Sequence, residues 1–471
     1  MRWIWIALAG LWAAAPAFGQ GADVLSRIER QLEANREIRL GSVGDLTTAE
    51  RLLLDFGGYV TLSGLAVDDE PGSTRVLREY DGKFWARAVY GGHEAYARLR
   101  VRYQDFNTGD SFDGGGDGLV QPIGDRYWYR FDLHRERQAE GKPGGRWNVW
   151  MQAGRQDILW ASGLTLNEVL YAIQGGVEAG SFAISILGGI TPRTTTVDID
   201  ASRPQFDTNT DRRFLGVIAE CRALDRHTPY IFFLDQSDEN NTVLPPGATF
   251  MYDSSYLGIG SRGEITGQVG YLAEFVKEWG TATSDPFRTF PQVTDDVNAW
   301  AARLAFFFVP RSMRDRGARF ELEILLASGD DDRFHSTQTL GGNLGGTDDK
   351  GFNAFGSAYT GLALAPELSN LLLIRLGGSA TPFHRHRILQ RLRVGLDVLF
   401  LNKMDSDAPI SVFTLPGEGF LGTEVDLLLD WEVLSDVYLE MRYGIFIPGK
   451  SGVFPEIDPR HFFYLGVSYG F

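Results

Sequence analysis

The sequence is poor in cysteine, in positive charge and in long apolar runs. Cys221 is the single cysteine among 471 residues, which excludes an intramolecular disulfide framework and a zinc site built from several cysteines. The formal net charge is −16, and this excludes an ordinary nucleic-acid binder, whose binding face is basic. After residue 20 no stretch approaches the length of an uncharged apolar membrane helix, so helical spans are not expected.

The N-terminus has the pattern of a secretory signal peptide. A weakly basic start precedes an apolar run over residues 3–15, and small residues lead to a cleavage position just before Gln20. We therefore assign residues 1–19 to a signal peptide and expect an exported protein. The alternative is a retained membrane anchor.

Residues 20–55 are expected to form a periplasmic N-terminal segment. Residues 23–38 place apolar side chains at helical spacing, and residues 47–54 begin with threonine and carry a glutamate three positions later, as in a capping box. Two interpretations of this segment remain open, a periplasmic arm and a solvated leader before the main body.

From Phe56 to the C-terminus the apolar pattern has a period of two. The sequence is rich in glycine, with 56 residues, and in aromatic residues, at 13%. About eighteen alternating segments of roughly nine to twelve residues follow one another, which is the length that a tilted strand needs to cross a bilayer. Examples are residues 97–103, 127–134, 320–326, 388–400 and 423–431.

Two features favour a membrane barrel over a soluble β-sandwich. Charged residues on one face of such long strands require a closed sheet, because open edges in lipid leave backbone groups unpaired. The final segment alternates apolar and small residues and ends on the aromatic Phe471, which is typical of outer-membrane proteins. The expected fold class is therefore all-β, an antiparallel transmembrane barrel over residues 56–471.

Three familiar enzyme motifs occur without the structural context that they need. Residues 444–451 match a P-loop, but prolines follow where a helix would have to begin. The glycines at 258, 260 and 263 lie in alternating sequence and predict a hairpin, not a dinucleotide fold. Residues 466–470 match a hydrolase elbow but are followed by a single residue. We therefore expect no cofactor and no enzymatic activity.

Acidic clusters in glycine-rich loops are candidates for calcium ligands, because carboxylate oxygens suit this hard cation. No complete twelve-residue calcium loop is present, and the alternative is that these are solvated extracellular loops. The candidate residues are Asp110, Asp113, Asp117, Asp330, Asp331 and Asp332.

Arginines recur on the polar faces of several predicted strands. Guanidinium groups pair with carboxylates in a bidentate manner, so arginines around a constriction would select acidic solutes. The alternative is that they pair with lumen carboxylates such as Glu424 and Glu440 and neutralise the wall. The predicted pore-lining residues are Arg98, Arg100, Arg102, Arg155, Arg375, Arg391 and Arg393.

Motifs in a fixed order along residues 56–471 resemble the bacterial alginate-export family of outer-membrane porins. They are Gly154-Arg155-Gln156-Asp157 with Trp160 and Gly163, then Ala327-Ser328-Gly329-Asp330-Asp331, and Gly422-Thr423-Glu424-Val425-Asp426-Leu427 followed by Tyr443-Gly444-Ile445-Phe446-Ile447-Pro448-Gly449. The resemblance implies a monomeric eighteen-stranded barrel whose arginine-rich channel passes an anionic uronic-acid polymer outward. Arg155 is the one candidate arginine inside a matched motif.

The leading hypothesis is a passive outer-membrane channel for an alginate-like polysaccharide. Its expected partners are the acidic polysaccharide, outer-membrane lipid and a periplasmic secretion scaffold. The first alternative is a general or nutrient-uptake porin on the same barrel. The second is an outer-membrane barrel enzyme, which would need a serine and a histidine at the lipid-facing rim.

Overall fold

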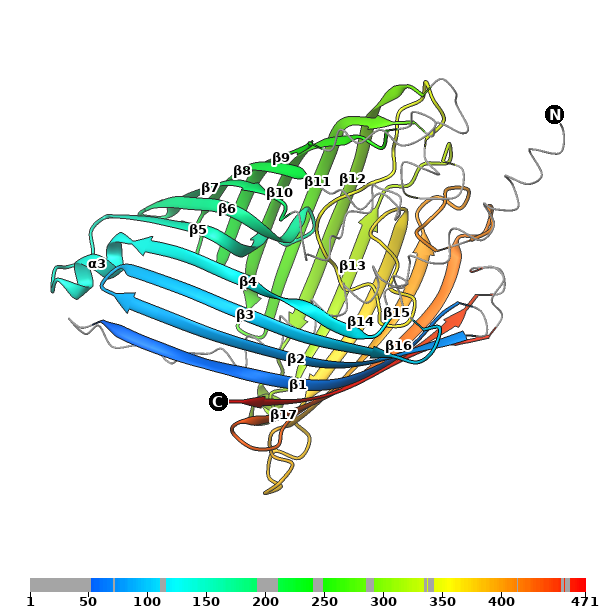
Figure 1. Ribbon diagram of the computed structural model, residues 1–471. Coiled ribbons are helices and arrows are strands. Elements are labelled where there is room, and N and C mark those ends of the chain that lie inside the picture. Colours follow the sequence, from blue (N-terminus) through cyan, green and yellow to red (C-terminus); the bar gives the residue numbers. More distant parts are fainter. Residues whose placement is uncertain are drawn as a thin grey trace.

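The computed structural model describes residues 52–70, 73–110, 116–192, 211–239, 249–284, 292–333, 337, 343–412, 414–449, 453 and 458–471. These residues form one 18-stranded antiparallel sheet that closes into a barrel (Figure 1). The predicted barrel is thus confirmed. No helix in the described parts of the chain is both long and apolar enough to span a bilayer.

The strands follow the chain order around the ring. They are β1 (Leu53–Glu70), β2 (Ser73–Tyr90), β3 (His93–Phe106), β4 (Gly118–Asp132), β5 (Trp147–Trp160), β6 (Leu166–Ala179), β7 (Phe182–Ile190), β8 (Arg212–Cys221), β9 (His227–Asp238), β10 (Tyr252–Thr266), β11 (Val269–Thr283), β12 (Thr294–Phe308), β13 (Arg319–Ala327), β14 (Leu371–Ala380), β15 (Leu392–Lys403), β16 (Phe420–Glu432), β17 (Val437–Pro448) and β18 (Arg460–Gly470). Two short helices, α3 (Leu133–Ala139) and the 3-10 helix η1 (Arg311–Arg316), lie in turns.

Closure of the barrel depends on the first and last strands. β1 pairs with β18 from Tyr59 opposite Gly470 to Val67 opposite Phe462. The terminal Phe471 adds two backbone hydrogen bonds of 3.0 Å, one in each direction, with Gly58. The aromatic C-terminus therefore completes the seam, and every strand has a neighbour on both sides.

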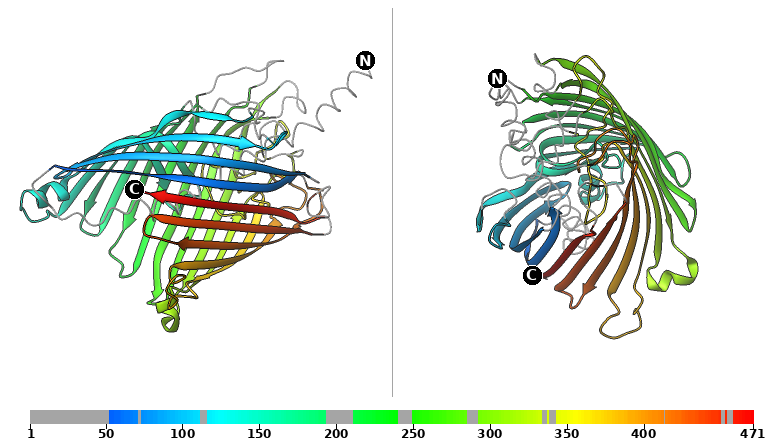
Figure 2. Two further views of the ribbon diagram at one scale, coloured as in Figure 1. Left: turned by 60° about the horizontal axis from the view of Figure 1, so that its bottom comes forward. Right: turned by 90° about the vertical axis from the view of Figure 1, so that its right-hand side faces the viewer.

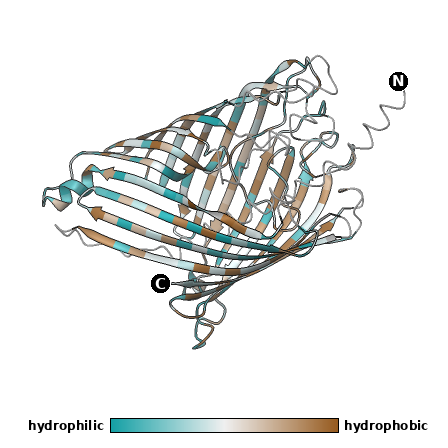
Figure 3. Cartoon of the chain, in the orientation of Figure 1, coloured by the Kyte–Doolittle hydropathy of each residue, from teal (hydrophilic) through white to brown (hydrophobic). Residues whose placement is uncertain are grey.

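Side chains alternate between the two faces of the sheet, as the period of two predicts. On β18 the outward residues Phe463, Leu465, Val467 and Tyr469 are exposed, whereas the inward Phe462 is buried. Figure 3 shows hydrophobic and hydrophilic residues alternating along the strands. The outer face of the barrel is therefore apolar, as a membrane requires.

The two ends of the barrel differ in their connections. At the end that holds the C-terminus, several strands are joined by tight turns, such as residues 91–92, 180–181 and 267–268. The opposite end carries longer connections, of which residues 328–370 between β13 and β14 are an example. Outer-membrane barrels have short periplasmic turns and longer extracellular loops, so the C-terminal end faces the periplasm.

Some boundaries differ from the expected ones. The segment 127–134 does not stay extended, because the Asp132 side chain accepts a hydrogen bond from the backbone N–H of Arg135 and caps α3. Residues 388–391 belong to the β14–β15 turn, and β15 begins only at Leu392. The barrel begins at Leu53 instead of residue 56, so the second predicted helix overlaps β1. The predicted signal peptide and the first helical segment lie outside the described residues.

The glycines of the dinucleotide-like motif lie inside β10 and do not form a hairpin turn. A Cβ atom at Gly258 would lie 2.0 Å from the Phe232 ring, and one at Gly260 would lie 2.3 Å from the Tyr230 ring. These glycines therefore leave room for aromatic side chains of the neighbouring strand β9, which the sequence pattern does not reveal.

We expect Gly258→Val to destabilise the barrel by about 1–3 kcal/mol, because the buried Phe232 ring would have to move in a packed interior. Thermal unfolding, followed by the electrophoretic shift of the folded barrel, measures the change. Gly64→Val is the matched control, since nothing lies within 4 Å of a Cβ at that strand position. Equal melting of both variants would contradict the proposed packing role.

Candidate functional site: the inner wall and the loop that crosses it

The described residues of the β13–β14 loop, which are 328–333, 337 and 343–370, fold into the barrel. Phe355 of the loop bridges to Leu166 of β6, with hydrogen bonds of 3.0 Å from Phe355 N to Thr165 O and 2.9 Å from Asn167 N to Phe355 O. Asp349 of the loop bridges to Val297 of β12. Figure 2 shows the loop, in yellow, within the ring of strands. The loop therefore contacts the wall at widely separated strands and narrows the lumen.

Glu424 of β16 anchors the far part of the loop. Its buried carboxylate accepts hydrogen bonds from the backbone N–H groups of Leu362, Ala363 and Leu364. Gly361 has a φ of +113°, and a Cβ there would lie 2.6 Å from this carboxylate. Successive N–H groups around one carboxylate form an anion-binding cradle, so Glu424 fixes the loop and is not an open charge on the wall.

A second carboxylate anchors the middle of the loop. Glu278 of β11 accepts a 3.0 Å hydrogen bond from Asn353 N and one of 2.7 Å from the Tyr252 hydroxyl. The Tyr256 hydroxyl donates to Asn353 O at 2.6 Å. These contacts are buried, where a polar group that lacks its hydrogen bond is costly.

The tip of the β5–β6 hairpin also folds inward. The Ser162 hydroxyl and backbone N–H donate to Glu274 of β11 at 2.6 Å and 3.1 Å, and Arg303 of β12 donates to Ser162 O at 3.1 Å. Since β11 and β12 lie several strands away around the ring, the tip has left the wall and covers the inner face of other strands. The tip and the β13–β14 loop together form the constriction.

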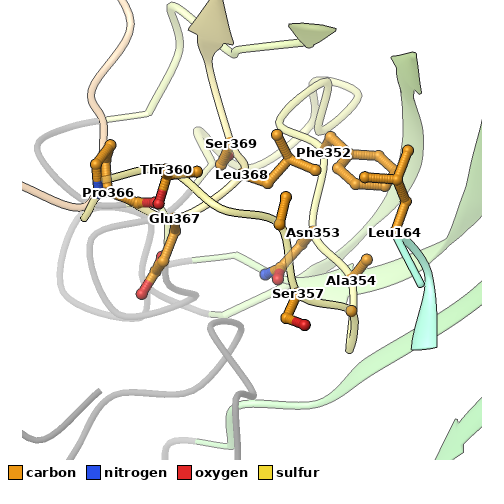
Figure 4. A pocket seen from close by; sticks show the side chains of 12 residues that line it. Leu164, Phe352, Asn353, Ala354, Ser357, Thr360, Pro366, Glu367, Leu368 and Ser369 are labelled. Atoms are coloured by element: carbon orange, nitrogen blue, oxygen red, sulfur yellow. The ribbon is translucent and has the colours of Figure 1, made fainter. Parts of the chain in front are cut away.

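Apolar packing joins this constriction to the wall. Phe352 and Phe355 of the loop lie in one buried cluster with side chains of β5–β13, and residues 362–364 lie in another with β13–β18 and β1–β3. A cavity of about 30 Å³ remains inside the loop, lined by Asn353, Ser357 and Glu367 among others (Figure 4). It has room for about one or two water molecules, so it is no solute path.

The inward residues of β2–β4 form a basic sector. Register places Arg98, Arg100 and Arg102 on the inner face of β3, as predicted from the alternation. With them lie Arg75, Lys83, Arg87, Arg126, Arg130 and the carboxylates Glu79, Asp81, Glu94, Asp125 and Asp132. Among the described inward side chains of these strands, cations therefore outnumber carboxylates.

Each arginine of this row has an acidic neighbour. Arg98 is 4% exposed and forms a bidentate pair with Asp125 at 2.7–3.0 Å. Arg100 lies 2.9 Å from Asp81, and Arg102 lies 3.4 Å from Glu79. This row therefore has the geometry of the alternative interpretation, in which the arginines pair with carboxylates and neutralise the wall. The side chains of Arg100 and Arg102 are 18% exposed and still reach the lumen.

On β13–β17 the inward carboxylates outnumber the cations among described residues. Arg375 lies between Glu321 and Glu323 of β13 and Asp397 of β15. Arg442 pairs with Asp430 at 2.6 Å and with Glu440 at 2.5 Å. The inner wall is therefore divided into a basic and an acidic sector, and Arg375 belongs to the acidic one.

The three remaining predicted arginines lie elsewhere. The pairing of Arg155 with Tyr127 and Tyr171, which are exposed and outward, places Arg155 on the outer face and not in the pore. Arg391 lies in the β14–β15 turn at the periplasmic rim and pairs with Glu432. Arg393 faces inward near that rim and donates to the Ser379 hydroxyl at 2.7 Å.

Several acidic residues of the loops accept hydrogen bonds from backbone N–H groups. Asp330 accepts from the N–H groups of Asp332 and Lys350 at 2.9 Å and 2.8 Å, and burial raises the pKa of its carboxyl. Asp331 and Asp332 lie beside it, with ligand oxygens within 4.8 Å. Asp110 and Asp117 accept backbone N–H groups of β2 and β3, and Asp113 lies outside the described residues. These contacts give the carboxylates a structural role.

Sequence reasoning missed Glu274, Glu278 and the anchoring role of Glu424. No local motif marks them, because their partners are backbone groups far away in the chain. The one available signal is that each is an acidic residue in an apolar strand, where a buried charge needs partners.

The closed barrel, with its apolar outer face and charged lumen, defines a bacterial outer-membrane β-barrel protein. Its family points to a channel and not to an enzyme. The chain belongs to the alginate export family, whose model matches residues 149–452. The resemblance of the sequence motifs to this family is therefore confirmed. Comparison with curated protein sequences gave no significant match.

Solved structures show the same fold at low sequence identity. OccAB1 of Acinetobacter baumannii matches with a TM-score of 0.55 and 8% identity over 89% of this chain and 96% of its own. OccK11 of Pseudomonas aeruginosa matches with a TM-score of 0.51 and 11% identity over 90% and 98%. OccK2 of Pseudomonas aeruginosa, in complex with glucuronate, matches with a TM-score of 0.51 and 12% identity over 88% and 97%.

We expect Glu424→Ala to loosen the β13–β14 loop, because three buried N–H groups lose their acceptor. Each N–H group left without a hydrogen bond costs about 1–3 kcal/mol of stability. Single-channel recording in a planar bilayer should show a larger and noisier conductance than the wild type. Glu432→Ala is the control on the same face of the same strand, at the rim. Wild-type conductance in a folded Glu424→Ala barrel would contradict the anchoring role.

Proposed function

We propose that this outer-membrane channel passes an anionic, uronic-acid-type polysaccharide passively along its basic sector. The row of Arg98, Arg100 and Arg102 carries the proposal. Alternate residues on a strand are about 7 Å apart, so the row offers repeated guanidinium groups to a chain of carboxylates. Family membership supports this solute class.

The acidic neighbours of these arginines favour passage of the polysaccharide over its retention in the channel. An arginine that already shares a carboxylate gains little by exchanging it for a carboxylate of the solute. Weak and repeated contacts keep a polymer in the channel without trapping it. The described strands and loops include no domain that would couple transport to an energy source, which supports passive diffusion.

One observation favours the second candidate, a porin for small solutes. The β13–β14 loop and the β5–β6 tip are fixed to the wall by buried hydrogen bonds, so the constriction resists widening, and a polymer crosses it only by threading end-first, whereas a monomer needs no such alignment. The two candidates share the anionic selectivity but differ in the largest solute that crosses.

For the charge selectivity, we expect the wild type to prefer chloride to potassium in a planar bilayer under a KCl gradient. The triple variant R98E/R100E/R102E should lower the chloride-to-potassium permeability ratio by about threefold or more, because wall charge sets the local ion concentration. Arg100→Gln with Arg102→Gln, which spares the buried Arg98–Asp125 pair, should shift it in the same direction. The control reverses three exposed arginines, Arg135, Arg213 and Arg222. An unchanged reversal potential in both lumen variants would refute the role of the row.

For the solute size, proteoliposome flux of glucuronate and of uronic-acid oligomers of increasing length separates the candidates. A polysaccharide channel should admit hexamers at a rate within about tenfold of the monomer, since a threaded chain adds contacts without adding width. A sharp cut-off after the monomer or dimer would establish the small-solute porin instead.

A further inference from the structure

Two neighbouring turns at the periplasmic end of the barrel are strongly basic. Residues 309–318 join β12 to β13, and residues 381–391 join β14 to β15. Together they carry six arginines and one acidic residue, Asp315, in a chain whose net charge is −16. The sequence contains no aspartate or glutamate from residue 368 to residue 396. Positive charge is therefore concentrated on these two turns.

The two turns contact each other and form one surface. Thr381 N donates to Arg316 O at 2.7 Å, and Nε2 of His384 lies 3.2 Å from the Asp315 carboxylate. Both turns project beyond the ends of their strands (Figure 2). We call this surface, made of residues 309–318 and 381–391, the basic rim.

Local hydrogen bonds hold the β14–β15 turn in shape. His386 N donates to Phe383 O at 2.7 Å. The His386 ring nitrogen Nδ1 accepts from the backbone N–H groups of Ile388 and Leu389 at 3.4 Å and 3.3 Å. The turn therefore presents its side chains from a fixed backbone.

The arginines of the basic rim differ in what they contact. Arg314 donates to a backbone carbonyl of the β10–β11 turn at 3.2 Å, and Arg391 pairs with Glu432, so these two stabilise the turns. Arg385 and Arg387 are exposed, and no carboxylate of the described residues forms an ion pair with them. Guanidinium groups bind phosphate oxygens in a bidentate manner. A phosphate bound to these two arginines would therefore not have to displace a carboxylate.

The basic rim adjoins the lipid-facing side of the wall. The indole N–H of Trp431 donates to Ile388 O at 3.3 Å, and register places Trp431 on the outward face with Leu427 and the exposed Leu396. Tryptophan is enriched at membrane–water interfaces, where its ring lies in an apolar region and its N–H reaches a polar group. The backbone of Ile388 therefore lies at the membrane boundary.

Apolar side chains accompany the arginines. Met313, Phe383 and Ile388 of the basic rim are exposed. Beside them, at the ends of β12 and β13, the outward Phe308 and Phe320 pair with ring centroids 6.4 Å apart. Exposed apolar side chains next to arginines suit a phospholipid, whose headgroup is charged and whose chains are apolar.

We propose that the basic rim binds the acidic headgroups of phospholipids in the periplasmic leaflet of the membrane. The headgroup phosphate contacts Arg385 and Arg387, and the acyl chains lie beside Ile388 and the outward aromatic residues. A soluble polyanion would use the arginines but would leave the apolar side chains in water, so the observations favour a lipid. This inference goes beyond polysaccharide transport and does not depend on it.

Native mass spectrometry of the intact protein tests the headgroup preference. The barrel is released from detergent micelles that contain equal amounts of phosphatidylglycerol and phosphatidylcholine with the same acyl chains, and the bound lipids are counted. We expect the wild type to retain phosphatidylglycerol about fivefold over phosphatidylcholine, because clustered arginines attract anionic headgroups. Higher ionic strength should lower this ratio, since salt screens exposed charges.

Variants assign the preference to the basic rim. Arg385→Gln with Arg387→Gln should lower the ratio to about twofold or less, because the phosphate loses its partners. Arg385→Lys with Arg387→Lys keeps the charge and should keep most of the preference, which a distorted turn would not. The control is Arg135→Gln with Arg222→Gln, two arginines of other periplasmic turns that already pair with glutamates, and it should leave the ratio unchanged.

Three results would overturn the lipid site. They are equal retention of the two lipids by the wild type, an unchanged ratio in the R385Q/R387Q variant, and an equal loss in the control. Uronic-acid hexamers that displace phosphatidylglycerol from the wild type would also overturn it, because the basic rim would then bind a soluble polyanion. A dimer that the R385Q/R387Q variant abolishes would instead make the basic rim an interface between two copies of the chain.

Discussion

The structure depends on the rule that backbone N–H and C=O groups must be paired where no water is present. This rule makes the sheet close, and the terminal Phe471 completes the pairing of β1 with β18. Charged groups inside the ring follow the same constraint, because a buried carboxylate such as Glu424 is held by backbone N–H groups that would otherwise lack an acceptor.

The acidic composition of the chain has a physical explanation inside the barrel. Some carboxylates neutralise arginines of the wall, as Asp125 does for Arg98. Others hold backbone N–H groups of the β13–β14 loop, as Glu424 does for residues 362–364. A negative total charge is therefore compatible with a basic sector on β2–β4. The carboxylates that hold loop backbone lie on other strands and do not neutralise the arginines of that sector.

The alternation of side chains predicted the strands and the inward row on β3, but not every face. Around Arg155 both faces of β5 are polar, with Gln156 inward and Asp157 outward, so alternation could not distinguish the pore from the outside. One strand start was also placed too early. The expected segment began at Ile388, but Leu389 and Gln390 interrupt its alternation, and the chain turns there, so β15 starts at Leu392.

The sequence by itself determined the barrel class, the approximate number of strands, the family and the separation into an apolar outer face and a charged inner one. These follow from a period of two and from motifs that are local in the chain. Only the tertiary structure decided where the β13–β14 loop and the β5–β6 tip lie, and which carboxylates hold them. The physical reason is that those contacts join residues such as Ser162 and Glu274, which are distant in sequence and meet only when the ring is closed.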